Sequence, residues 1–109
     1  MVTWQIRQHG KALEGPAAPD APVEVEAVLA LDGRSRQKPL EAHATITVDT
    51  LAGRPVQEIG HTRAGEHGAQ GAVRLAKGLY RVVARGEVTL DGGERRPFVA
   101  RGPFLRVGG

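Results

Sequence analysis

The sequence predicts an all-β chain that folds as an antiparallel two-sheet sandwich of about seven strands. Apolar and polar side chains alternate along seven short segments, with the period of strands rather than helices. Turn-forming Gly, Pro and Asp residues separate these segments. The 109 residues suit one domain, so residues 1–109 are interpreted as a single sandwich, with a small β-barrel as the alternative. The expected strands are residues 3–8, 23–31, 41–49, 56–62, 72–76, 79–90 and 96–107.

The first four of these strands lie within residues 3–62. Residues 3–8 and 23–31 each place alternate apolar side chains on one face. The pattern is cleanest in residues 41–49, where even-numbered apolar residues point inward and odd-numbered polar residues, including Asp49, point outward. Residues 56–62 follow a proline, which favours the edge of a sheet. An edge strand can pair with another chain, so a homodimer through this strand is one expected assembly.

Three segments between the strands are expected to be loops. Residues 9–22 are rich in Gly, Pro and Ala and have no period, which indicates a surface loop or, alternatively, a loop that closes over a ligand. Residues 32–40 begin with the turn signal Asp-Gly and are basic. Residues 65–71 contain three glycines and are therefore expected to be a loop that precedes the short fifth strand.

The last two strands form a hairpin whose loop length follows from its register. Paired residues of an antiparallel ladder lie on the same face of the sheet. A two-residue loop would pair Glu87 with Phe98 and would put charge and core on one face. An odd number of loop residues instead pairs Phe98 with Gly86 or Val88, so we predict an odd loop.

A β-bulge is expected in the last strand at Gly102 and Pro103. The extra residue would shift the alternation of side chains beyond it. Leu105 and Val107 would then continue the core that Phe98 begins.

One motif points to a known architecture. Residues 75–84 read L-x-x-G-x-Y-x-V-x-A and resemble the E–F corner of immunoglobulin-like and fibronectin type III-like domains. The resemblance implies that Leu75 is the last core residue of one strand and that Gly78 permits the turn. It also implies that the Tyr80 hydroxyl hydrogen-bonds to backbone just upstream. The cysteine pair of antibody domains is absent, so the resemblance concerns the broad fold.

Composition narrows the classes of function. The chain has no Cys, which excludes disulfides and Cys-based zinc sites. No segment approaches the ~20 apolar residues of a membrane-spanning helix, so no membrane partner is expected. The N-terminus lacks a charged region followed by an apolar one, and we therefore expect a cytoplasmic location. The excess of Arg over Lys, with abundant Gly and Ala, is typical of a GC-rich genome, and a bacterial source is expected.

Patterns that would indicate catalysis or a cofactor are weak. His61 and His67, with Glu66 between them, are the best candidates for metal ligands, but their spacing matches no helical metal motif. Ser35 lies between two arginines without the Gly-x-Ser-x-Gly turn of a hydrolase, so a phosphorylation or anion site suits it better than a catalytic role. We expect no enzyme activity, no metal and no cofactor.

Charge is unevenly spread along the chain. Residues 1–60 carry six basic and eight acidic groups, whereas residues 61–109 carry nine and four. The basic groups gather in the last hairpin, where they can attract an acidic partner, although an ordinary solvated strand face would have the same composition. The expected interaction surface consists of Arg81, Arg85, Arg95, Arg96 and Arg101.

These observations predict a non-enzymatic module for protein–protein interaction, an accessory domain or subunit of a bacterial assembly. The alternative is a β-barrel that binds a small ligand or nucleic acid through the basic hairpin. Nucleic acid is not the expected partner, because stacking on bases requires exposed aromatic rings. Tyr80, Phe98 and Phe104 are instead expected to lie in the core.

Overall fold

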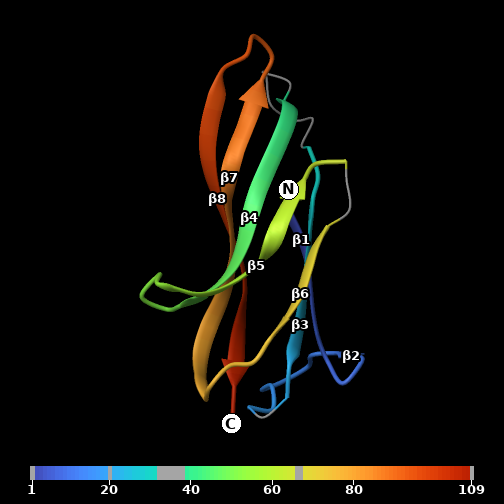
Figure 1. Cartoon of the computed structure of the whole chain (residues 1–109), viewed down its shortest axis with the longest axis vertical. Helices are drawn as coiled ribbons and strands as arrows, with labels where there is room; N and C mark the ends of the chain where they lie inside the picture. The colour runs from blue at the N-terminus through green and yellow to red at the C-terminus, as the bar shows by residue number, and fades with distance from the viewer. Residues whose placement is uncertain (1, 20, 32–38, 66–67, 109) are drawn as a thin grey trace.

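The computed structural model describes residues 2–19, 21–31, 39–65 and 68–108. These residues form eight β-strands and no helix (Figure 1). Most of the expected basic loop at 32–40 lies outside the described residues. The strands are β1 (Val2–Gln8), β2 (Lys11–Ala12), β3 (Val23–Leu29), β4 (Pro39–Thr50), β5 (Pro55–Arg63), β6 (Ala69–Val73), β7 (Gly78–Leu90) and β8 (Arg95–Val107).

The strands form two separate antiparallel sheets of four strands each. One sheet has the order β2-β1-β3-β6 and the other has the order β5-β4-β7-β8 (Figure 1). The two sheets are not closed into one, so the prediction of a two-sheet sandwich is confirmed and the barrel alternative is wrong. β5 lies at a sheet edge, as the sequence predicted, and its pairing with a second copy stays a prediction.

All seven predicted strands are present, and one short strand was missed. β2 pairs with the end of β1 through a two-residue turn at His9 and Gly10, whose φ angles of 56° and 74° turn the chain back on itself. The predicted loop at 65–71 is wrong in part, because β6 already begins at Ala69. Its glycine serves packing: a Cβ on Gly71 would lie 3.0 Å from the carbonyl oxygen of Ile59 on β5.

The core lies between the inner faces of the two sheets and consists mainly of small aliphatic side chains. Even-numbered residues of β4, such as Ile46 and Val48, face odd-numbered residues of β3, such as Val25. At two positions beside this core, a glycine lets a neighbouring backbone or side chain approach more closely than a larger residue would allow. A Cβ on Gly102 would lie 2.6 Å from the indole of Trp4, and one on Gly86 would collide with the carbonyl oxygen of His43.

The hairpin of β7 and β8 has the predicted register. Gly86 pairs with Phe98, and the amide of Leu90 donates to the carbonyl of Glu94 over 2.8 Å, so three residues form the loop. The predicted odd loop is confirmed. Gly92 and Gly93 both have positive φ, which allows this turn.

The predicted bulge in β8 is also present. Arg81 pairs with Phe104 and Val83 pairs with Arg101, so Gly102 and Pro103 together lie opposite Val82. Beyond the bulge Leu105 is buried, as expected. The expectation that Phe104 lies in the core is wrong, since it is 58% exposed. An extended strand that turns Leu105 inward turns the preceding residue outward.

The segment between β6 and β7 carries the chain from one sheet to the other. Leu75 in this segment is buried, and the Tyr80 hydroxyl donates to the carbonyl of Ala76 over 2.8 Å. This is the hydrogen bond that the resemblance at residues 75–84 implied. The expectation that Gly78 permits the turn is wrong, because its φ is not positive and a Cβ there would make only an ordinary contact of 3.4 Å with the Tyr80 hydroxyl.

The segment after β2 is fixed along the edge of β8. The amide of Ala17 donates to the carbonyl of Arg106, and the amide of Gly108 donates to the carbonyl of Ala17, each over 2.8 Å. The Gln8 side chain holds the same segment, since it accepts from the amide of Ala18 and donates to that residue's carbonyl. Part of the predicted surface loop at 9–22 therefore closes one side of the sandwich.

Gly86→Ala should lower the free energy of unfolding by about 3 kcal/mol, because the added methyl collides with backbone of β4. Gly15→Ala is the matched control, since no atom lies within 4 Å of its Cβ position. Urea denaturation followed by fluorescence of Trp4 measures both variants. Equal stability of the two variants would contradict the close approach of β4 and β7.

Tyr80→Phe should lower the free energy of unfolding by about 1 kcal/mol, since it removes only the hydroxyl that donates to Ala76. The same denaturation experiment measures the change. An unchanged midpoint would show that this hydrogen bond does not stabilise the crossover between the sheets.

Candidate functional site

The outer surface of β4, β7 and β8, called the basic face here, carries most of the predicted interaction residues. Odd-numbered residues of β4 and β7 point outward on it, because their even-numbered neighbours fill the core. Arg81, Arg85, Arg95 and Arg101 share this face by their positions in the ladder. Arg96 does not join them, because it pairs with Val88 and so belongs to the opposite face of the sheet. Its guanidinium lies 3.3 Å from the Glu94 carboxylate.

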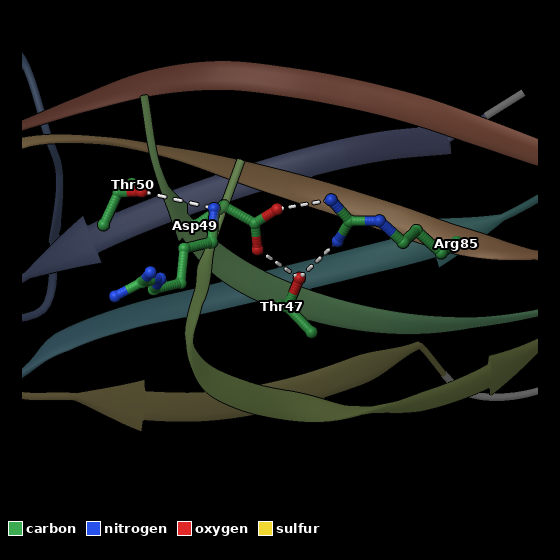
Figure 2. Close-up of polar contacts among 5 residues, drawn as sticks. Thr47, Asp49, Thr50 and Arg85 are labelled. Atoms are coloured by element: carbon green, nitrogen blue, oxygen red, sulfur yellow. Dashed lines mark hydrogen bonds and ion pairs between the residues drawn. The ribbon is translucent and has the colours of Figure 1, made fainter. Parts of the chain in front are cut away.

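A buried carboxylate lies on the basic face near the end of β4. Asp49 is only 1% exposed, and its Oδ2 lies 2.6 Å from a guanidinium nitrogen of Arg85 (Figure 2). The Thr47 hydroxyl donates to the other carboxylate oxygen over 2.6 Å and accepts from Arg85 over 3.1 Å. The three side chains form a closed ring of hydrogen bonds. Asp49 points outward as predicted, but its burial was not foreseen.

The turn that follows Asp49 ends β4 and returns the chain to β5. The amide of Thr50 donates to the carbonyl of Arg54, and the amide of Arg54 donates to the Thr50 hydroxyl. Gly53 has a φ of 87°, which the turn requires and which other residues rarely adopt. Because the turn projects beside the outer face, it forms one wall of a surface hollow.

This basic hollow has a volume of about 500 Å³, within the size range of ligand sites. Its walls come from the end of β4, from the turn, and from the outer faces of β7 and β8. The lining residues are Asp49, Thr50, Leu51, Ala52, Gly53, Arg81, Val83, Arg85, Arg101 and Phe104.

The basic hollow has an excess of positive charge. Three guanidinium groups and one carboxylate line it, and Asp49 offsets only Arg85. Arg81 lies over the ring of Phe104, 4.4 Å from its centroid, and its Nε donates to the carbonyl of Gly102. The side chain of Arg101 makes no hydrogen bond or ion pair with any residue that the structure describes. Arg81 is therefore oriented by its neighbours, whereas no described residue orients the Arg101 side chain.

A second hollow, of about 360 Å³, lies between β1 and β8 at the side of the sandwich. It is called the apolar hollow here after the side chains of Trp4, Ile6 and Leu13, although polar atoms make up more of its exposed lining. Its residues are Trp4, Ile6, Leu13, Gly15, Pro103, Phe104 and Arg106. Phe104 lines both hollows, so its exposed ring is the ridge between them.

The other candidates from the sequence do not form a site in the described part of the chain. His61 lies beside His43, with ring centroids 5.3 Å apart, and no group of three metal-ligating side chains is found among the residues described. His67, Glu66 and Ser35 lie outside those residues. Within the same residues, no helix has the length and apolarity to cross a membrane.

Sequence reasoning missed three contributors to the site. Phe104 was assigned to the core, although the predicted bulge already contained the signal that it points outward. Asp49 and Thr47 were interpreted as ordinary outward residues of β4. Their pairing with Arg85 depends on the contact of β4 with β7, and the sequence pattern contains no signal of that register.

Comparisons of the chain with protein-family models, with curated proteins and with solved structures give no match.

Asp49→Asn should lower the free energy of unfolding by about 2 kcal/mol, because an amide cannot neutralise Arg85 at this buried position. Glu41→Gln is the control: its carboxylate pairs with Arg63 in the open, and its loss should cost less than about 0.5 kcal/mol. Chemical denaturation of both variants measures the difference. Equally small losses would contradict a stabilising role for the buried pair.

Proposed function

We propose that this chain is a non-enzymatic binding module of the immunoglobulin-like class that contacts a protein partner through its basic face. In this proposal the chain is an accessory domain or subunit of a bacterial assembly. The partner contacts the ridge of Phe104 and the arginines beside it.

The strand order supports the immunoglobulin-like class. β1, β3 and β6 lie side by side in the order of strands A, B and E of such domains. In the other sheet, β5, β4, β7 and β8 follow the order C′, C, F and G. The Tyr80 hydroxyl donates to the carbonyl of Ala76 where the chain crosses from β6 to β7, the position that corresponds to the E–F corner.

One observation carries the proposal of a protein partner: large apolar side chains are exposed beside unneutralised arginines. Phe104 is 58% exposed, Val99 57% and Leu51 56%. Phe104 and Leu51 line the basic hollow with Arg101, and Val99 lies on the same face of β8. Aromatic residues and arginines are enriched where proteins bind one another, and exposed apolar groups gain most when a partner covers them.

The chemistry of the hollow favours binding over catalysis. Asp49 is the one carboxylate among the described lining residues, and its oxygens are engaged by Thr47 and Arg85. A general base must lie within reach of its substrate, and the Asp49 carboxylate is buried beneath its partners. The ring of hydrogen bonds instead fixes Arg85 and the floor of the site.

Nucleic acid is the second candidate, and the exposure of Phe104 favours it more than the sequence did. A base can stack on an exposed aromatic ring beside arginines that contact phosphates. However, the guanidinium of Arg81 already covers one face of this ring, and a stacking platform normally offers several rings. A protein partner therefore fits the face better.

Photo-crosslinking in the native cells tests the proposal. A benzoylphenylalanine at Val99, on the basic face, should yield one discrete protein adduct. The same group at Val28, on the outer face of the other sheet, should not. Arg101→Glu should abolish the adduct at Val99, because it reverses one of the two positive charges that no described carboxylate of the lining neutralises. Equal adducts at both positions, no adduct at Val99, or an adduct removed by nuclease would overturn the proposal.

A further inference from the structure

Two hollows of different chemistry meet at a single side chain. The basic hollow and the apolar hollow are both lined by Phe104, and each is large enough for one side chain of a partner. A partner that fills both must pass over the ridge of Phe104. The chemistry of each hollow defines what it can accept.

The basic hollow suits a carboxylate. Asp49 neutralises Arg85, so the charges of Arg81 and Arg101 are left over among the described lining residues. The planar fork of a guanidinium matches the two oxygens of a carboxylate and binds it through paired hydrogen bonds. Arg81 is held in place by the carbonyl of Gly102 and by the ring of Phe104, so little conformational entropy is lost when it binds.

The apolar hollow suits a large aliphatic or aromatic side chain. Trp4, Ile6 and Leu13 are each only partly buried there, and Pro103 adds an apolar wall. A side chain placed among them would complete the burial of these three residues. Apolar surface that a partner side chain buries against them adds to the affinity of the contact.

The backbone of β8 limits how a partner can approach. Pro97 and Pro103 have no amide hydrogen to offer, and Ala17 already bonds to the carbonyl of Arg106. Addition of a partner strand to this edge is therefore disfavoured along these parts. Recognition has to come from side chains in the two hollows.

We propose that the partner presents an extended segment with an acidic residue and a large apolar residue two positions apart. This inference rests on the proposed function and specifies the partner's chemistry. Alternate side chains of an extended segment point the same way and lie about 6.7 Å apart, roughly the span across one aromatic ring. The acidic side chain enters the basic hollow and pairs with Arg101 and Arg81. The apolar side chain crosses Phe104 and enters the apolar hollow beside Trp4.

The chain contains one tryptophan, and it lines the apolar hollow, so its fluorescence reports directly on occupancy. The probes are capped peptides with the core Glu-Gly-Leu, and the same core in reverse order, because the direction of binding is open. Peptides with Gln for Glu or Gly for Leu are the matched controls. A phosphoserine version and a short oligothymidylate test whether the basic hollow prefers phosphates.

One Glu-Gly-Leu orientation should shift the emission of Trp4 in a saturable way, and each control peptide should bind at least about tenfold more weakly. Arg101→Gln should remove the preference for Glu over Gln. Arg95→Gln, on the same face but outside the hollow, should keep it.

Equal affinity of the Glu and Gln peptides would overturn the inference, as would tighter binding of the phosphoserine peptide or the oligothymidylate. If none of the peptides changes the emission of Trp4 while Val99 still crosslinks to a protein, the inference fails and the proposed function stands. If neither experiment gives a signal, both fail.

Discussion

The bulge at Gly102 and Pro103 is the constraint on which the proposed site depends. Two residues of β8 lie opposite Val82, and the alternation of side chains reverses beyond them. Leu105 therefore enters the core, and Phe104 stands on the outer face. Gly102 also lets the indole of Trp4 approach the strand, and its carbonyl accepts from Arg81. One local irregularity thus forms the ridge, orients an arginine beside it and brings Trp4 close to the second hollow.

The ion pair between the buried Asp49 and the half-exposed Arg85 connects β4 to β7 on the other side of the same hollow. Asp49 lies at the end of β4, where the chain leaves the sheet for the turn that walls the site. Through Thr47 the pair forms a ring of hydrogen bonds across β4 and β7. Among the described residues that line the hollow, neutralising Arg85 in this way leaves the charges of Arg81 and Arg101 uncompensated. The arrangement separates an arginine with a structural role from the two that the proposed function assigns to binding.

Much of the fold could be predicted because successive side chains of a β-strand point to opposite faces of the sheet, which limits how strands can pair. The clash of Glu87 with Phe98 in an even loop was enough to fix the hairpin register, and Gly86 indeed faces Phe98. The start of β6 at Ala69 could not be predicted, because Gly71 in this strand serves a close contact with Ile59 of β5, which the sequence pattern does not show. The site was predicted only in part. The arginines were visible as a charge cluster, but the burial of Asp49 depends on pairing between strands. The prediction that Phe104 lies in the core conflicted with the same prediction for Leu105, since neighbouring side chains of a regular strand point to opposite faces.

Thiol accessibility on the two sides of the bulge tests the central claim most directly. The chain has no cysteine, so Phe104→Cys and Leu105→Cys each introduce a single thiol. In the folded protein a thiol-reactive dye should label the Phe104→Cys variant at the rate of an exposed thiol. It should label the Leu105→Cys variant only when the chain unfolds, because that position is 1% exposed. Fast labelling of the Leu105→Cys variant with protection of the Phe104→Cys variant would contradict the bulge and the site built on it.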